Sequence, residues 1–352
     1  MDITPYLKLM VEKNASDLFF TENSPVKIKI EGKMSSVGKT MLTGEMTKAA
    51  ANGIMTDHQI AYYEEHLEAD FAIWLPDRSA RFRVNVFRQR GEVGMVLRLI
   101  PITIPTIDRL GLPAILKDLI MQKRGLVLMV GATGTGKSTT IAAMIQHRNE
   151  NADGHILTIE DPIEFAYPNI KSIVNQREIG LDTYSYRNAL RSSMREAPDV
   201  IVIGEIRDRE SMAAALVLCN TGHLCVSTLH ANNANQAMER VVNMFPQEHH
   251  KQLFLDLSMN LRAVISQRLL EGFDGKRCAA IETMINTPHI ADLILRGHVD
   301  EIKEAMEQSG ARGMQTFDLA LFNLYKEGRV SLDEALSNAD SRTNLEAKIN
   351  FG

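Results

Sequence analysis

A glycine-rich loop between an apolar stretch and a helical one constrains this sequence more than any other feature. The apolar run Gly125 to Val130 precedes the loop, and the run Ile141 to Ile145 follows it. The loop fits the pattern Gly-x-x-x-x-Gly-Lys-Ser/Thr, which requires a strand before it and a helix after it. Its residues are Gly131, Ala132, Thr133, Gly134, Thr135, Gly136, Lys137, Ser138 and Thr139. The sequence therefore predicts a phosphate-binding loop in an α/β fold; the alternative is a plain turn rich in glycine and threonine.

The chemistry of the loop follows from its residue types. Glycines let the backbone wrap its N–H groups around a phosphate at distances that a Cβ atom would obstruct. The helix that begins near Lys137 adds its N-terminal amides and its dipole to the same anion. We expect Lys137 to reach the β- and γ-phosphates of ATP and the hydroxyl of Ser138 to ligate Mg²⁺.

Length and charge limit the remaining possibilities. The chain has 352 residues, more than one hydrophobic core usually organises, so two domains are expected. The formal charge is -5 and no run of lysine or arginine resembles a nucleic-acid-binding arm, so nucleic acid is not an expected partner. Neither a long apolar stretch nor a signal peptide is recognised, and a cytoplasmic location is expected.

Residues 1–100 combine short strands with a helical stretch, which predicts a small α+β domain. The helical stretch spans 47–67, and Arg90-Gly91 marks a turn that joins the last two strands as a hairpin. Prolines within 101–113 then indicate an extended interdomain linker. The expected strands, rich in β-branched and aromatic residues, are 16–20, 26–31, 71–75, 81–87 and 95–100.

Arginines mark one face of this domain. Polar and apolar residues alternate through 81–87, so Arg81, Arg83 and Asn85 should share one face of a strand. Arg98 follows on the neighbouring strand. From these residues alone, the favoured interpretation is a solvated basic face.

Four apolar runs follow the linker, and each ends in polar residues. Their length and β-branched content predict parallel strands of a helix-covered sheet, within an ATPase core at 114–285. Ligands of such sheets bind at the carboxyl ends of the strands, where these polar residues stand. The runs are 126–130, 155–159, 200–203 and 224–228.

Acidic residues follow the second and third of these strands. Glu160, Asp161 and Glu164 come after the second, where carboxylates near a nucleotide ligate Mg²⁺ or orient water; an acidic turn is the alternative. Glu205 ends the third strand, after Gly204 in the slot where a Walker B motif often has its Mg²⁺-binding aspartate. We expect Glu205 to orient the water that attacks the γ-phosphate, with structural capping as the alternative.

His223 and His230 bracket the fourth strand. Seven residues apart, their rings face opposite sides and cannot share one metal ion without a bend in the strand. One or both are expected to hydrogen-bond to the γ-phosphate or to a neighbouring acid and so to report which nucleotide is bound. The alternative is a satisfied polar residue at a strand end.

The pattern becomes helical after about residue 234. A helical C-terminal part is expected at 286–352, with a loose tail from residue 340. Ser331 and Glu334 form a plausible capping box. The helical pattern is carried by Leu253, Leu257, Leu261 and Ile265, which recur every four residues, and by the amphipathic stretches 299–308, 314–326 and 331–338.

With these sites in order, the chain resembles the secretion ATPase superfamily, the hexameric motors of type IV pili and type II secretion. Residues 158–164 resemble the Asp box of that family, 197–208 its Walker B region, and 221–230 its His box. The resemblance covers about residues 1–290. It implies a PAS-like N-terminal domain joined by a mobile linker to a RecA-like domain, with six chains in a ring.

The resemblance also changes the expected role of several residues. Arg83 and Arg98 fall where the family carries arginines that reach the nucleotide, which implies arginine fingers swung in by domain closure. Glu164 acquires a catalytic or Mg²⁺-linked role beside Glu205. The implied partners are further copies of the chain and a pilus platform protein of the inner membrane, to which the ring would be peripheral.

Within the family, the chain resembles the retraction motors of the PilT and PilU kind, because it shows neither a further N-terminal domain nor a four-cysteine zinc module. PilT-type motors carry the C-terminal element Ala-Ile-Arg-Asn-Leu-Ile-Arg-Glu. The comparable region here is His-Ile-Ala-Asp-Leu-Ile-Leu-Arg-Gly, residues 289–297. This departure favours a PilU-type accessory motor that works with a main retraction ATPase. The alternatives are a non-catalytic ATP-binding adaptor, a pilus assembly or type II secretion ATPase, and a nucleic-acid translocase.

Overall fold

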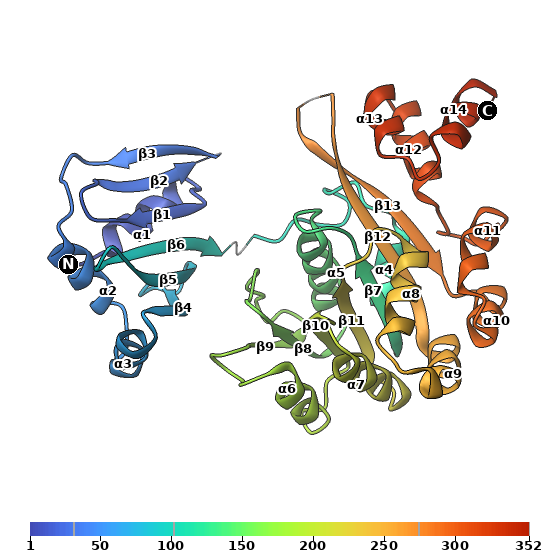
Figure 1. Ribbon diagram of the computed structural model, residues 1–352, viewed down its shortest axis with the longest axis horizontal. Coiled ribbons are helices and arrows are strands. Elements are labelled where there is room, and N and C mark those ends of the chain that lie inside the picture. The colour runs from blue at the N-terminus through green and yellow to red at the C-terminus, as the bar shows by residue number, and fades with distance from the viewer. Residues whose placement is uncertain (31, 101–102, 274, 352) are drawn as a thin grey trace. The chain divides into compact units, whose positions relative to one another are not determined.

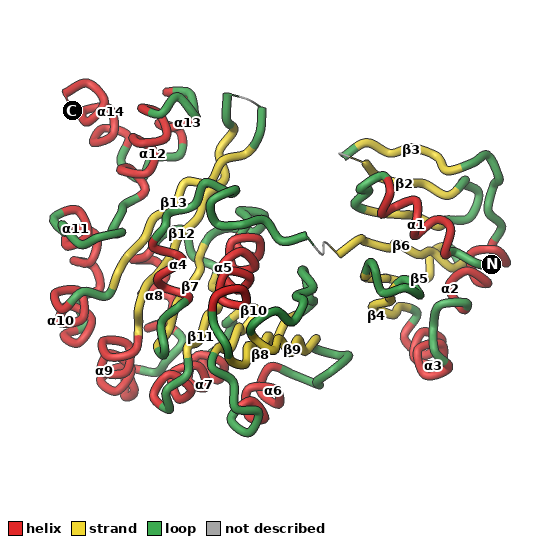
Figure 2. The backbone as a smooth tube through the Cα atoms, turned by 180° about the vertical axis from the view of Figure 1, so that it is seen from behind, coloured by secondary structure: helices red, strands yellow, loops and turns green. Residues whose placement is uncertain are grey.

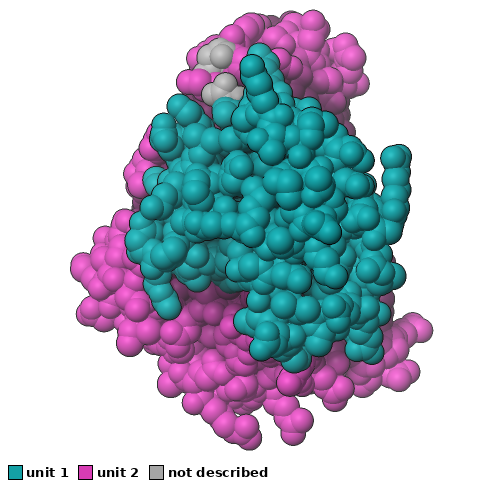
Figure 3. Space-filling view, turned by 90° about the vertical axis from the view of Figure 1, so that its left-hand side faces the viewer, with its two compact units in different colours: residues 1–103, 164–166 teal, residues 104–163, 167–352 magenta. Residues whose placement is uncertain are grey.

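The computed structural model describes residues 1–30, 32–100, 103–273 and 275–351. The chain divides into two compact units, coloured separately in Figure 3. The first comprises Met1–Thr103 with Glu164–Ala166, and the second comprises Ile104–Ile163 with Tyr167–Gly352. Of the linker expected at 101–113, residues 101 and 102 lie outside the described residues, as does residue 31 of the second expected strand.

The first unit is a six-stranded antiparallel sheet with three helices, as Figure 1 shows in blue and teal. The strand order is β3-β2-β1-β6-β5-β4. The strands are β1 (Asp17–Phe20), β2 (Val26–Ile30), β3 (Lys33–Val37), β4 (Glu68–Trp74), β5 (Arg81–Gln89) and β6 (Glu92–Ile100). The helices are α1 (Thr4–Glu12), α2 (Gly44–Asn52) and α3 (Asp57–His66).

Alternation along β5 builds the core of this unit. Phe82, Val84 and Val86 are fully buried, while Arg83 and Asn85 lie on the other face and are partly exposed. The expected hairpin is confirmed: β5 pairs antiparallel with β6, and the turn residues Arg90 and Gly91 both have positive φ.

The helical stretch expected at 47–67 was wrong as one element. Helix α2 ends at Asn52, with Gly53 as its C-cap, and a new helix starts with a capping box in which Thr56 and Gln59 exchange hydrogen bonds. Strand β3 was not predicted, because its exposed residues carry no apolar alternation.

The second unit contains a seven-stranded sheet in the order β13-β12-β7-β11-β10-β8-β9. All neighbouring strands run parallel except β12 and β13, which form an antiparallel hairpin at one edge. Figure 2 shows this sheet in yellow between layers of helices. The strands are β7 (Gly125–Val130), β8 (Gly154–Glu160), β9 (Ser172–Glu178), β10 (Val200–Glu205), β11 (Leu224–Leu229), β12 (Leu261–Glu271) and β13 (Arg277–Ile285).

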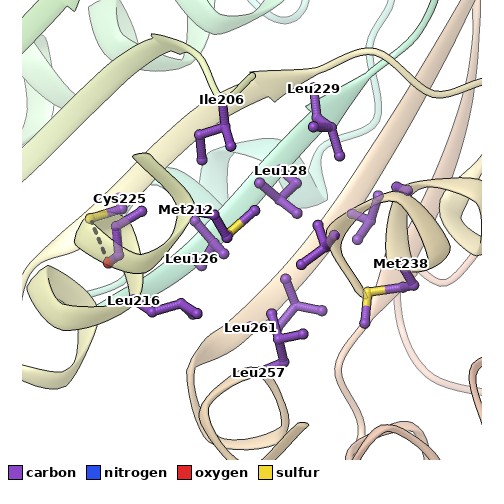
Figure 4. Packing of buried hydrophobic residues seen from close by; sticks show 14 of the residues in the cluster. Leu126, Leu128, Ile206, Met212, Leu216, Cys225, Leu229, Met238, Leu257 and Leu261 are labelled. Atoms are coloured by element: carbon purple, nitrogen blue, oxygen red, sulfur yellow. Dashed lines mark hydrogen bonds between the residues drawn. The ribbon is translucent and has the colours of Figure 1, made fainter. Parts of the chain in front are cut away.

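Helices cover both faces of this sheet, so its central strands are apolar on both sides. On one face, Leu126 and Leu128 of β7 join Met212 and Leu216, and Figure 4 shows this cluster. On the other face, Val127 packs with residues of the helices beside the phosphate loop. The helices are α4 (Ile115–Ile120), α5 (Lys137–Asn151), α6 (Tyr186–Ser193), α7 (Arg209–Asn220), α8 (Ala234–Asn243), α9 (His250–Asn260), α10 (Pro288–Arg296) and α11 (Ile302–Glu307), with the short 3-10 helices η1 (Gln247–His249) and η2 (Val299–Glu301).

Three further helices form a small C-terminal layer beside the β12–β13 hairpin (Figure 1). They are α12 (Phe317–Lys326), α13 (Leu332–Ser337) and α14 (Arg342–Phe351). Phe317, Leu321 and Leu345 are fully buried there with Leu270 of β12. The helical C-terminal part is thus confirmed, but the expected loose tail was wrong, because Leu345 anchors α14 in this core; residue 352 lies outside the described residues.

Two other expectations also fail in this unit. Leu253 and Leu257 lie in α9, but Leu261 and Ile265 lie in strand β12. Because β12 is buried on both faces, it shows no alternation that would separate it from a buried helix. The Ser331 hydroxyl accepts the Glu334 N–H at 3.1 Å, but the Glu334 carboxylate does not complete the box and accepts the N–H of Glu271 instead.

No helix in the described part of the chain is long and apolar enough to cross a lipid bilayer.

A buried carboxyl group in β13 makes stability depend on pH. Glu282 is 2% exposed, and its Oε1 accepts hydrogen bonds from the Ala234 N–H at 2.7 Å and the Ser266 hydroxyl at 2.9 Å. Burial raises the pKa of Glu282 above its ordinary value. The folded state therefore binds this proton more tightly than the unfolded state. The resulting stability is present below the ordinary pKa and is lost as the pH rises through the raised pKa.

We therefore expect Glu282→Gln to unfold at a higher temperature than the parent at pH 8, with a smaller difference at pH 5. Glutamine keeps the accepting oxygen and carries no charge at either pH. Thermal unfolding at both pH values checks this, with the exposed Glu239→Gln as the matched control. An unfolding-temperature difference that is the same at pH 5 and pH 8 would contradict the assignment.

Candidate functional site

The phosphate-binding loop connects the carboxyl end of β7 to helix α5. Gly134 and Gly136 have φ values of +81° and +84°, a left-handed conformation that favours glycine. Helix α5 begins at Lys137, and no side chain caps its first turn, so its first amides face the loop. The Lys137 Nζ donates to the carbonyl oxygens of Gly131 and Ala132, both at 2.8 Å. The amides at the start of α5 and the Lys137 ammonium group therefore both lie at the loop, the arrangement that binds a phosphate.

A buried glutamine, which the sequence reasoning missed, holds this loop. Gln267 of β12 is 3% exposed, and its Nε2 donates to the backbone carbonyl of Thr135 at 2.7 Å. Its Oε1 accepts the hydroxyl of Thr140 in α5 at 2.7 Å. A Cβ atom on Gly131 would lie 2.6 Å from the Gln267 carbonyl oxygen, so the loop packs directly on this strand. The available signal was a run of three polar residues, 266–268, between the apolar residues of this strand.

Glu205 ends β10, two strands away from β7 in the sheet order. Its Oε2 accepts the Nε–H of Arg207 at 2.7 Å, and its Oε1 lies 3.0 Å from the His230 Nε2. The side chain is only 15% exposed. A carboxylate can accept about four hydrogen bonds, so Glu205 can still accept one from a water molecule. The bond to Glu205 raises the pKa of Arg207, which sequence reasoning did not single out.

Close packing explains why glycine occupies position 204. A Cβ atom there would lie 2.7 Å from the hydroxyl oxygen of Tyr186 and 3.2 Å from the carbonyl oxygen of Ile159. A side chain at this position would therefore displace the Tyr186 hydroxyl and press on strand β8. Burial, followed by the charge of Asp161, raises the pKa of Tyr186, so its hydroxyl stays neutral beside the acids.

The three acids expected after β8 differ from one another in exposure and in hydrogen bonding. Glu160 accepts hydrogen bonds from the Thr158 hydroxyl at 2.6 Å and the Gln176 amide at 3.2 Å. Asp161 and Glu164 are exposed, and Glu164 groups with the first unit. In the described residues, no three His, Cys, Asp or Glu side chains gather as a metal-binding cluster.

The two histidines lie at opposite ends of β11. His230 follows the carboxyl end and contacts Glu205. His223 precedes the amino end, level with Gly125, and its Nδ1 lies 3.0 Å from the Leu218 carbonyl oxygen. The structure thus brings His230 to the same edge as the phosphate loop and leaves His223 at the far edge. For His223, the expected contact with a phosphate is not available within its own chain.

The two predicted arginine fingers lie side by side in the first unit. Arg83 of β5 pairs directly with Arg98 of β6 in the antiparallel register. The Arg98 Nε donates to the Oδ1 of buried Asp17 at 2.8 Å, and the Arg83 Nε lies 3.8 Å from the Oδ1 of Asp70. Both guanidinium groups therefore stand on one polar face of the sheet.

Comparison with known proteins places the whole chain in one family. The model of the type II/IV secretion system protein family matches residues 1–345. The type IV pilus ATPase PilU of Pseudomonas aeruginosa is 50% identical over 353 residues, covering 100% of this chain and 92% of that protein. The type IV pilus retractation ATPase PilT of the same organism is 42% identical over 345 residues, covering 98% of this chain and 100% of that protein.

A solved structure agrees with these relatives. The crystal structure of the pilus retraction motor PilT with bound ADP matches with a TM-score of 0.91 and 38% identity, covering 98% of this chain and 99% of that one. The mixed α/β fold and the resemblance stated from the motifs are thereby confirmed. The chain belongs to the type II/IV secretion system protein family, in its branch of PilT and PilU type IV pilus ATPases.

Proposed function

We propose that this chain is an ATP-hydrolysing motor that powers or assists retraction of type IV pili, as an accessory to a main retraction ATPase. The observation that carries the proposal is the placement of Glu205 at the same sheet edge as a complete phosphate-binding loop. The identity with PilU over the whole chain favours the accessory role.

The loop and Glu205 divide the work of hydrolysis. The amides of the loop and Lys137 would hold the β- and γ-phosphates. Ser138 and Glu205 would hold Mg²⁺, with Glu164 as a further acidic ligand or helper. When bound there, Mg²⁺ would supply positive charge against the phosphate oxygens. Glu205 orients water for in-line attack on the γ-phosphate and accepts its proton. His230, in contact with Glu205, links this carboxylate to the state of the γ-phosphate.

The remaining catalytic groups come from the other unit. Arg83, Arg98 and Glu164 belong to the first unit, whereas the loop and Glu205 belong to the second. We propose that a homo-hexameric ring brings them together, and that closure of the N-terminal unit on the nucleotide drives the motor. The ring would act from the cytoplasm, peripheral to the inner membrane, on a membrane-embedded pilus platform protein and beside a paralogous main motor, with no nucleic acid involved.

Glu205→Gln tests the central assignment. We expect ATP turnover to fall about 100-fold or more, because general-base catalysis contributes roughly 10² to 10⁴ in rate. Affinity for ADP measured without Mg²⁺ should stay within about twofold, since glutamine keeps the shape of the side chain. Steady-state turnover and binding of a fluorescent ADP analogue measure the two effects. The control is Glu210→Gln, an exposed acid of α7 paired with Arg187; a Glu205→Gln protein as active as this control would refute the role.

Arg98→Gln tests the arginine finger. Such arginines are worth about 10³ to 10⁵ in turnover, so we expect a loss of at least about 100-fold. The control is Arg88→Gln, an exposed arginine on the same sheet. Equal ATP turnover by the two variants, measured at matched ring content, would remove Arg98 from the catalytic set.

Turnover against protein concentration tests the ring. If neighbouring copies complete each site, ATP turnover per subunit should rise as rings assemble and vanish in Lys137→Ala, but persist in the exposed-lysine variant Lys123→Ala. Turnover per subunit that is independent of concentration would contradict sites completed by assembly. If parent and Lys137→Ala are equally inactive, the chain is an adaptor or a motor that requires its paralogue, and adding the main retraction ATPase separates the two.

A further inference from the structure

Two consecutive residues of β12 contact different parts of the second unit. Gln267 lies on the face toward α5, where it bonds to Thr135 of the phosphate loop and to Thr140 of the first helical turn, each at 2.7 Å. Because successive side chains of a strand point to opposite faces, Arg268 lies on the face toward the C-terminal helices. One strand therefore contacts both the loop and these helices.

Arg268 makes polar contacts between the sheet and the C-terminal helices. Its Nη1 donates to the carbonyl oxygen of Asn338 at 2.5 Å, and its Nη2 donates to the Oδ1 of Asp340 at 2.6 Å. Its guanidinium carbon also lies 3.9 Å from the ring centre of Phe317, at the start of α12. Arg268 thus contacts α12 and the connection between α13 and α14.

Asp340 completes this contact from the helical side. Its side chain is 9% exposed, and its second oxygen accepts the Nζ of Lys303 at 3.1 Å. Its backbone N–H donates to the Oδ1 of Asp318 in α12 at 2.8 Å. A nearly buried carboxylate held by two cations and tied to α12 fixes these helices more firmly than an exposed ion pair would.

A cavity is lined by residues of both the phosphate loop and the C-terminal helices. It has a volume of about 550 Å³ and lies between the phosphate loop and the β12–β13 hairpin. Thr133 and Thr135 line it from the loop, Arg277 from β13, and Glu334 from α13. Helix α13 and the phosphate loop therefore share the wall of one cavity.

We propose that Gln267 and Arg268 couple the phosphate loop to the C-terminal helices, so that nucleotide binding and the seating of α12–α14 favour each other. Gln267 is a positioning residue: it sets the loop through Thr135 and α5 through Thr140, and any shift of β12 moves Arg268 with it. Coupling of this kind is reciprocal, because two events linked by one free energy affect each other equally. The inference rests on nucleotide binding from the proposed function, and does not depend on hydrolysis or on pilus retraction.

Asp340→Asn tests the coupling at a distance from the loop. This change weakens the Arg268 contact and touches no residue of the phosphate loop. We expect a fluorescent ADP analogue to bind at least about fivefold more weakly, the lower end of typical coupling between sites. The matched control is Asp333→Asn, an exposed aspartate of α13 that receives the same chemical change. Its affinity should stay within about twofold of the parent.

Hydrogen exchange gives the reciprocal measurement. ADP should slow amide exchange across 317–351 in the parent, and Gln267→Leu should abolish this slowing.

Equal ADP affinity of Asp340→Asn and Asp333→Asn, with faster exchange of α14 in the former, would overturn the proposal, because the helices would then loosen without affecting the loop. Should Asp340→Asn fail to fold, Lys303→Met weakens the same carboxylate contact, and unchanged ADP affinity in that variant would equally overturn it. Failure of all proteins, parent included, to bind ADP would instead refute nucleotide binding itself.

Discussion

Parallel pairing of β7, β11 and β10 is the constraint on which the rest of the second unit depends. In register, Leu229 pairs with Val130, and Glu205 pairs with Thr228, so these three strands end at one edge of the sheet. The strands stay in this register because helices bury them on both faces. Burial of side chains along the whole length of the strands therefore fixes where the few polar residues at their ends can meet. A disturbance of the core would move Glu205 relative to the phosphate loop even if neither were changed.

Close approach of backbones sets the chemistry available at this edge. Gly131 packs on the backbone carbonyl of Gln267, and Gly204 packs on the Tyr186 hydroxyl and the Ile159 carbonyl. At position 204 this closeness disfavours any side chain, and the one acid of strand β10 is Glu205. Arg207 and His230 then hold that acid from both sides. The site therefore has one carboxylate of β10, held in place by two neighbours.

Much of this architecture could be predicted from the sequence, and the failures share physical causes. The phosphate loop, the four parallel strands and the hairpin at Arg90 carry local signals in glycine spacing, apolar runs and turn residues. Strand β12 could not be distinguished from a helix, because burial on both faces removes the alternation. The role of Gln267 depends on a partner more than 100 positions earlier in the chain, and no local pattern encodes such a contact. His223 was grouped with His230 by spacing, but the direction of the strand separates them.

The predicted catalytic residues are divided between the two units. Within the second unit, strand β12 contacts both the phosphate loop and the C-terminal helices. Gln267, on one face of β12, contacts the loop, and Arg268, on the opposite face, contacts the C-terminal helices. A deletion or insertion of one residue between Leu261 and Gln267 would exchange the two faces and put each side chain against the wrong neighbour. Length changes after Glu271 would leave both contacts in place. Variation in chain length among natural homologues should therefore collect at the end of this hairpin and avoid the strand that leads to it.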